Sequence, residues 1–256
     1  MSVSVLRIDP DLGADLDDSR LAAAQRACLA RVLQVPRGPW EVEALEADES
    51  GFGLLVVSGI LCRRIVQSES NGAELIGPGD LLRPWDTIGD WSSIPSESSW
   101  TALEPTQLAL LDRGFVNRAS PYPEISVQLL RRGLLRSRYL ATLAAVISQR
   151  RIETRLLMLF WHLADRFGHI RGAWVDIPVP LTHSVLAELV AARRPSVTTA
   201  LSQLNERGVL HREGDGWRLK GTVPPELLEA QSVGSSGEAG ARVGRPASGR
   251  LTLSAR

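Results

Sequence analysis

The chain has 256 residues, of which 44% are hydrophobic and 23% charged, a composition that suits one or two soluble globular domains. Its 29 basic and 29 acidic residues leave no net charge, which excludes a basic field over the whole protein and restricts any nucleic-acid binding to a local patch. Without an apolar run of about 18 residues, and with an acidic N-terminus that lacks an apolar core, the sequence predicts neither a membrane partner nor a secretory signal, and we expect a cytoplasmic protein.

The N-terminal part predicts one helix followed by a β-rich domain. Residues 17–33 carry apolar side chains at helical spacing behind Asp17 or Asp18 as the N-cap. From about residue 39 to residue 112, short β-like runs alternate with turn signals, a spacing typical of a small barrel or jelly roll. The predicted strands are FGLLVVSG, ILCRRIVQ, AELIG and QLALLD; turns are expected at 58–60, 70–72 and 77–80, and a loop at 86–99.

A long helix is predicted over residues 123–150, and its apolar side chains fall on two faces. A helix with two apolar faces needs two partners, one of which is expected to be the barrel. The other face, which is rich in alanine, either pairs two copies of the helix in a homodimer or packs inside one subunit, and periodicity leaves both open. The first face holds Ile125, Leu129, Leu140, Leu143 and Ile147; the second holds Leu130, Leu134, Ala141, Ala144 and Ala145.

The C-terminal part predicts a winged helix-turn-helix. A helix at 151–167 precedes a helix at 182–191, and a tight turn leads from there to a third helix at 194–207. A β-hairpin at 209–220 then supplies the wing. Beyond about residue 229 the chain is rich in Gly, Ser and Ala with little large apolar content, which predicts a disordered tail.

Two arginines stand at the N-terminal end of the predicted helix 194–207, where the helix dipole disfavours cations. In a winged helix-turn-helix this end lies nearest the base edges of the major groove, so phosphates and guanine offset that cost. Arg194 is the predicted base contact; if the winged helix instead served protein contact, the arginine pair would only be solvated. The candidate DNA-binding residues are Arg193, Arg194, Ser196, Thr198 and Thr199 on the helix and His211, Arg212 and Arg218 on the wing.

Residues 181–221 read LTHSVLAELVAARRPSVTTALSQLNERGVLHREGDGWRLKG. This run resembles the DNA-binding domain of the Crp/Fnr family of bacterial transcription regulators, and the order of barrel, long helix and winged helix is similar over about residues 40–221. Ala191 replaces the glycine of the family's helix turn, and Pro195 replaces an acidic base-reading residue, so we expect a different half-site. The matching positions are Leu181, Thr182, Leu186, Ala187, Val190, Arg194, Ser196, Val197, Leu201, Leu204, Gly208 and Leu210.

The resemblance implies an α+β protein with four parts. These are a cyclic-nucleotide-binding-like β-roll domain with an N-terminal helix at 1–120, a linker and dimerisation helix at 121–150, a winged helix-turn-helix at 151–228 and the tail at 229–256. It implies a sequence-specific regulator that binds double-stranded DNA as a homodimer, with RNA polymerase as a further candidate partner. The rival interpretation is a ligand-sensing or protein-interaction module whose winged helix does not read DNA.

Barrels of this family often bind a cyclic nucleotide, with a Gly-Glu pair on the ribose and an Arg-Ser pair on the phosphate. The run LLRPWDTIGDW contains no Gly-Glu pair, and an alignment on residues 102–104 puts Ser96 and Glu97 where Arg and Ser belong. The sequence has no arginine between Arg83 and Arg113, and the carboxylate of Glu97 would repel a phosphate. We therefore expect a diverged effector barrel that does not respond to cyclic nucleotides, and the effector stays unassigned.

The sequence offers few residues for a metal cluster, for catalysis or for binding another ligand. Cys28 and Cys62 are too few for a four-cysteine iron–sulfur cluster and are expected to be buried as small hydrophobes. Catalytic motifs are absent from the sequence, so we expect no enzyme and no resident cofactor or metal. Trp85, Trp91 and Trp100 either line a cavity for an apolar ligand or fill the core. The histidines outside the predicted barrel, expected to be structural or solvated, are His162, His169, His183 and His211.

Overall fold

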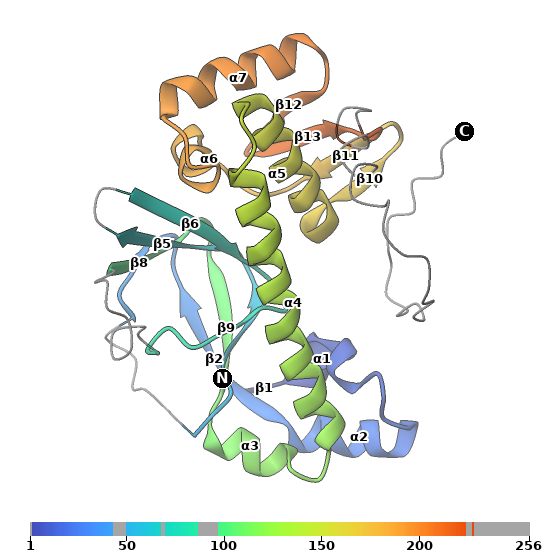
Figure 1. Ribbon diagram of the computed structural model, residues 1–256. Helices are drawn as coiled ribbons and strands as arrows, with labels where there is room; N and C mark the ends of the chain where they lie inside the picture. The colour runs from blue at the N-terminus through green and yellow to red at the C-terminus, as the bar shows by residue number, and fades with distance from the viewer. Residues whose placement is uncertain (1, 43–49, 68–69, 87–96, 224–226, 228–256) are drawn as a thin grey trace, which may run out of the picture. The chain divides into compact units, whose positions relative to one another are not determined.

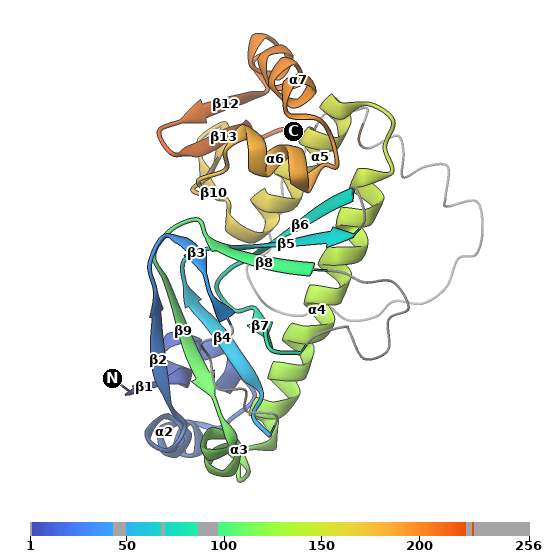
Figure 2. The ribbon, with the colours of Figure 1, turned by 90° about the vertical axis from the view of Figure 1, so that its left-hand side faces the viewer.

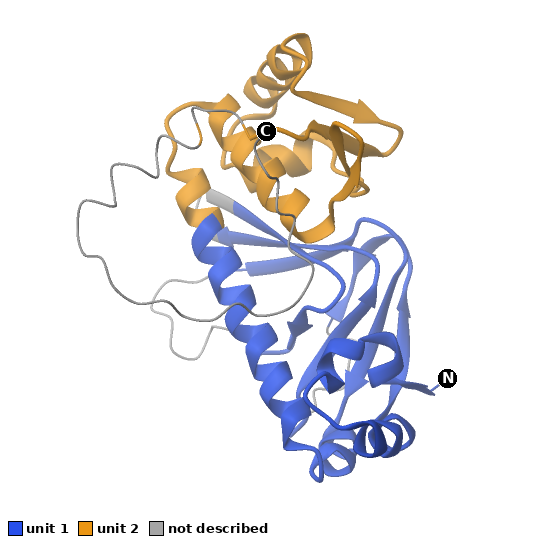
Figure 3. Ribbon diagram, turned by 90° about the vertical axis from the view of Figure 1, so that its right-hand side faces the viewer, with its two compact units in different colours: residues 1–142 blue, residues 143–256 orange. Residues whose placement is uncertain are grey.

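The computed structural model describes residues 2–42, 50–67, 70–86, 97–223 and 227. The chain divides into two compact units, Met1–Thr142 and Leu143–Arg256 (Figure 3). The long helix α4, Pro123–Ile147, crosses from the first unit into the second. Within the described ranges, the helices lack the combination of length and hydropathy that a membrane span requires. The predicted disordered tail lies outside the described residues.

Two antiparallel sheets form the β-domain of unit 1 (Figures 1 and 2). Their strands are β1 (Ser2–Ser4), β2 (Leu29–Val35), β3 (Gly38–Trp40), β4 (Gly53–Ser58), β5 (Leu61–Gln67), β6 (Ser70–Ile76), β7 (Leu81–Leu82), β8 (Glu97–Ala102) and β9 (Thr106–Leu111). One sheet has the order β1-β2-β9-β4-β7 and the other the order β3-β8-β5-β6. Leu54, Leu61 and Leu108 belong to one buried cluster that joins the two sheets. The jelly-roll-like, mixed α and β architecture predicted from the sequence is confirmed.

Helices cover the other face of the five-stranded sheet. They are α1 (Val5–Ile8), the 3-10 helix η1 (Pro10–Gly13), α2 (Asp18–Ala27), α3 (Arg113–Ala119) and the first half of α4. Leu55 and Leu111 of the sheet share a buried cluster with Ile125 and Leu129 of α4. One apolar face of α4 therefore packs on its own β-domain, as expected, although Leu140, predicted to lie on that face, is 40% exposed because it stands beyond this cluster.

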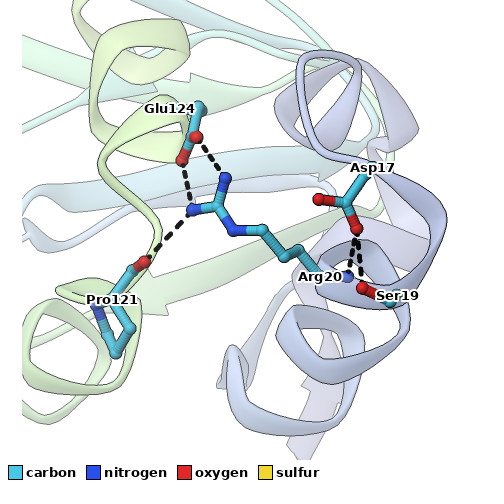
Figure 4. A network of polar contacts seen from close by, with 5 residues as sticks. All are labelled: Asp17, Ser19, Arg20, Pro121 and Glu124. Atoms are coloured by element: carbon cyan, nitrogen blue, oxygen red, sulfur yellow. Dashed lines mark hydrogen bonds and ion pairs between the residues drawn. The ribbon is translucent and has the colours of Figure 1, made fainter.

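Polar contacts fix α2 against the start of α4 (Figure 4). Asp17 caps α2 by accepting a hydrogen bond of 2.9 Å from the Arg20 backbone N–H. The Arg20 guanidinium donates to both carboxylate oxygens of Glu124 at 2.5 and 3.0 Å and to the Pro121 carbonyl at 3.3 Å. Such a two-point contact holds the guanidinium in one plane and ties α2 to the first turn of α4.

Three predictions about the N-terminal domain are wrong in detail. The helix predicted over 17–33 ends at Ala27, because the following residues pair with β9 as strand β2, with Arg31 opposite Leu110. The turn predicted at 70–72 lies inside β6, because these residues pair with the end of β5. The loop predicted at 86–99 is shorter at its end, since β8 begins at Glu97 and pairs with β5; residues 87–96 lie outside the described ranges.

Unit 2 combines helices with one antiparallel sheet. Its elements are α5 (Ile152–Phe167), β10 (His169–Arg171), β11 (Trp174–Ile177), α6 (His183–Leu189), α7 (Arg194–Glu206), β12 (Leu210–Glu213) and β13 (Gly216–Lys220). The sheet order is β10-β11-β13-β12, so the wing hairpin β12–β13 is extended by a hairpin β10–β11 that the sequence analysis missed. Trp217 of the wing packs on Phe160 of α5 with a ring separation of 5.0 Å and donates to the Leu181 carbonyl at 3.2 Å.

Candidate nucleic-acid interface

Helix α7 presents one apolar and one polar side. Val197, Leu201 and Leu204 recur at helical spacing and are at most 5% exposed, which fixes the rotation of the helix about its axis. The polar residues between them therefore point to solvent. Arg193, Arg194, Thr198 and Thr199, four of the five predicted contact residues on this helix, are exposed together, and Ser196 is half-buried.

The N-terminal end of α7 is suited to an anion. Arg193 is the N-cap residue in extended conformation, and its side chain makes no capping hydrogen bond. The first turn contains no acidic residue, and Pro195 removes a backbone N–H that would have no partner inside the helix. The positive end of the helix dipole therefore coincides with two exposed guanidinium groups, an arrangement that costs stability in the free protein and favours phosphate.

The threonine hydroxyls of α7 donate hydrogen bonds to backbone carbonyls of the same helix. Thr198 donates to the Arg194 carbonyl at 3.1 Å, and Thr199 donates to the Pro195 carbonyl at 3.2 Å. Each hydroxyl has only one proton, so in this conformation it offers only acceptor lone pairs to a ligand. Cytosine and adenine present amino donors in the major groove, and these fit such acceptors better than a phosphate does.

His183, in the first turn of α6, contacts α7, although the sequence analysis assigned it a structural or solvated role. Its Nδ1 lies 3.0 Å from Thr198 Oγ1 on α7. Because Thr198 Oγ1 donates its proton to the Arg194 carbonyl, it can accept a hydrogen bond from Nδ1 in the tautomer that carries the ring proton there. Partial burial lowers the pKa of His183, and the nearby charges of Arg212 and Arg194 lower it further. The wing and α7 thus each place one arginine near the imidazole of His183.

The wing residues separate onto two faces of the hairpin. Arg212 lies opposite the buried Trp217 in the ladder and is exposed. Its charge is close enough to His183 to lower the pKa of that histidine. His211 and Arg218, opposite one another in the ladder, lie on the other face. There His211 Nδ1 lies 2.5 Å from Asn205 Oδ1, and the ring packs on Trp174 at 5.1 Å.

Arg218 is engaged inside the protein. Its Nε donates to Asp176 of β11 at 2.8 Å, and its Nη2 lies 3.6 Å from Glu213. Asp176 also lies 3.2 Å from the Arg171 guanidinium. The charge of Arg218 is therefore largely neutralised, and Arg212 is the wing arginine that faces solvent beside α7.

The tryptophans of the β-domain contribute to its core. Trp100 is 7% exposed and packs edge-to-face on Trp40 with ring centroids 5.6 Å apart. Trp85 packs against the same buried cluster. These contacts favour the core-filling interpretation for both residues, whereas Trp91 and Ser96 lie outside the described ranges and Glu97 is exposed at the start of β8.

Two buried carboxylates of the β-domain are neutralised by arginines. Glu74 on β6 is 5% exposed and lies 2.5 Å from Arg63 on β5 and 2.7 Å from Arg136 on α4. Asp80, 7% exposed, accepts from the Gly77 N–H at 2.9 Å in the predicted 77–80 turn and lies 3.9 Å from Arg136. An anionic ligand at this place would compete with Glu74 and Asp80 for the same arginines.

Comparison with known proteins identifies the C-terminal unit. Residues 151–223 match the family described as a Crp-like helix-turn-helix domain. The chain is 28% identical over 192 residues to a CRP-like cAMP-activated global transcriptional regulator of Mycobacterium tuberculosis, covering 73% of this chain and 84% of that protein. It is 32% identical over 142 residues to the regulatory protein CysR of Synechococcus elongatus, covering 54% and 60%.

A solved structure shares the fold over most of the chain. The cyclic nucleotide-binding domain containing protein from Listeria monocytogenes has a TM-score of 0.62 and 18% sequence identity. The match covers 84% of this chain and 98% of the Listeria chain.

Proposed function

We infer the function from the premise that the chain belongs to the Crp/Fnr family of transcription regulators. It is a DNA-binding regulator and not an enzyme. The rival interpretation, a winged helix that does not read DNA, gains no support from the comparisons or from the exposed cations of α7. The roles of individual residues, the oligomeric state and the further partners are proposals.

We propose that α7 lies in the major groove with its N-terminal end nearest the bases. The observation that carries this is the pair of exposed arginines at an uncapped helix N-terminus, flanked by Thr198, His183 and Arg212. Arg194 reads a base edge, and Arg193 and Arg212 hold phosphates. The hydroxyls of Thr198 and Thr199 accept from base amino groups. Ser196, His211 and Arg218 remain predicted DNA contacts. His211 already contacts Asn205 and Arg218 pairs with Asp176, which makes these two less available to DNA.

We also propose that two copies pair through α4. Its exposed positions follow spacings of three and four residues, the repeat of a coiled-coil seam. Val127, Leu130 and Leu134 are 59%, 66% and 57% exposed, unusually high for large apolar side chains in a row. The seam consists of Val127, Leu130, Leu134, Ser137, Ala141 and Ala144, whose small C-terminal members permit close approach of two helices. RNA polymerase remains a predicted partner, and no effector is assigned.

The function is tested by comparing arginines at the two ends of α7. The probe is a duplex enriched from random-sequence DNA by the wild-type protein, beside an unrelated duplex of equal length. Arg194→Ala should weaken binding to the enriched duplex by about 1–3 kcal/mol per half-site and affect the unrelated duplex much less. Arg207→Ala, which removes the same charge at the C-terminal end, should leave the preference intact. Failure to enrich any sequence, or equal effects of both variants, would contradict the proposed function.

A further inference from the structure

The turn between α6 and α7 adopts an unusual backbone conformation. Ala191 has φ of +49°, the sole non-glycine residue with positive φ among the described residues. The Ala192 N–H bonds to the Ala187 carbonyl at 2.9 Å and the Ala191 N–H to the Glu188 carbonyl at 3.3 Å, which makes the turn a Schellman motif. Glycine is usual at this position, because a Cβ is strained in the left-handed region.

This turn determines where the recognition helix begins. Ala192 and Arg193 are the residues between the left-handed Ala191 and the first residue of α7. A change of φ at Ala191 therefore redirects α7 and moves both arginines at its N-terminus. The left-handed conformation is less favourable for alanine than for glycine, because alanine has a Cβ. We therefore expect contacts from outside the turn to stabilise it.

One side chain supplies that support. Arg155 of α5 donates through Nη1 to the Val190 carbonyl at 3.0 Å and to the Ala191 carbonyl at 3.1 Å. These carbonyls lie at the C-terminal end of α6, where the backbone lacks helical partners and the dipole favours a cation. The Arg155 Nε donates to the Gln149 carbonyl at 2.6 Å, between α4 and α5. This second bond fixes the guanidinium in place.

We propose that Arg155 is the positioning residue of the recognition helix. Its guanidinium, anchored on Gln149, holds the strained turn at Ala191 and thereby the placement of Arg193 and Arg194. The positioning role rests on the proposed DNA-reading function, whereas the support of the turn does not. Arg155 itself need not touch DNA.

The test uses Arg155→Met, which keeps the aliphatic stem and removes every donor. The full-length variant should bind the enriched duplex about tenfold more weakly than wild type, the loss expected for hydrogen bonds from a charged group, and bind an unrelated duplex within about twofold. Arg151→Met removes the same charge from an exposed position at the start of α5 and should leave both affinities within about twofold of wild type.

Relief of the backbone strain separates positioning from general stability. Ala191→Gly adopts the positive φ at no Cβ cost, so the double variant Arg155→Met/Ala191→Gly should recover affinity to within about threefold of wild type. If Arg155→Met alone does not fold, the double variant carries the test and should fold and bind. A double variant that stays as weak as Arg155→Met, or that stays unfolded, would overturn the proposal.

Hydrogen exchange in the absence of DNA gives the independent readout. The amide protons of Ala191 and Ala192 should exchange faster in Arg155→Met than in wild type, and slow again in the double variant. If wild type enriches no duplex, the proposed function fails and this exchange still decides whether Arg155 holds the turn. Unchanged exchange in Arg155→Met would refute that role.

Discussion

Arg212 and Arg218 are wing arginines in opposite electrostatic situations. Arg212 is exposed beside His183, whereas Arg218 is paired with Asp176 on β11. The sequence predicts both as phosphate contacts, because alternation along a hairpin and a basic composition do not reveal an acidic partner 42 residues away. That partner is brought in by the hairpin β10–β11, which was not predicted. The positions of Arg193 and Arg194 at the start of α7 were predictable, because they depend only on the helical spacing of nearby residues.

The two wing arginines should therefore respond differently to removal. Arg212→Ala should weaken binding to all duplexes alike and make the salt dependence shallower by about one phosphate contact per subunit. Arg218→Ala should change the salt dependence little and instead lower the free energy of unfolding slightly, because it removes the partner of Asp176. Affinities at several salt concentrations and urea unfolding test both, and a larger salt effect for Arg218→Ala would reverse the assignment.

His183 should link DNA binding to pH. In the free protein, burial and the charges of Arg212 and Arg194 lower its pKa, so the folded state binds fewer protons than the unfolded state and loses stability as pH falls below about 6.5. DNA phosphates beside these arginines cancel their repulsion and raise the pKa of His183. Binding therefore takes up a fraction of a proton per subunit, and affinity should increase as pH falls through about 6.5.

The measurement is DNA affinity above and below this pH for His183→Gln and, as control, for His169→Gln on the exposed strand β10. The pH dependence should weaken in the first variant and persist in the second. Equal pH dependence in wild type and His183→Gln would exclude this role.

Among the elements, α4 serves as a packing helix and as an exposed apolar stripe. Its length, its two apolar faces and the winged helix elements were predictable, because sustained 3.6-residue periodicity depends on the segment itself. The helix predicted at 17–33 was too long because the segment LARVLQV fits both a helical and a strand pattern of apolar residues. Its pairing with β1 and β9 makes it strand β2. Short strands such as β8 were missed because their pairing partners lie far away in sequence.

The stripe on α4 should hold a dimer. Leu134→Glu places a charge in the proposed seam and Ala141→Phe prevents close approach, so each should shift the protein towards monomer at micromolar concentration in sedimentation. Thr142→Glu, exposed and outside the seam, should leave association unchanged. Wild-type protein that sediments as a monomer at this concentration would refute the dimer.

At the scale of the whole molecule, a β-domain with its own core is joined through α4 to a DNA-binding unit. The interior of the β-domain next to α4 holds Glu74 and Asp80 in ion pairs with Arg63 and Arg136. This arrangement was not predictable, because the four residues come from different parts of the sequence. It leaves the buried carboxylates paired with arginines without a ligand, which agrees with the cyclic-nucleotide motif being absent from the sequence.

Cyclic AMP and cyclic GMP should consequently not bind, although one relative carries cAMP activation in its name. The ribose and phosphate motifs are missing, and an added anion must compete with two buried carboxylates for their arginines. Titration calorimetry of the full chain should give no saturable heat at millimolar nucleotide. A micromolar dissociation constant for either nucleotide would contradict this expectation.

The central claim, that α7 reads DNA as one half of a symmetric pair, is tested most directly by selecting bound sequences from random duplex DNA. The account predicts an inverted repeat whose half-site centres lie about one helical turn apart. With Arg194→Ala, the same selection should lose its preference at one position in each half-site. Selected pools without a shared sequence, or a preference that is identical for wild type and Arg194→Ala, would contradict it.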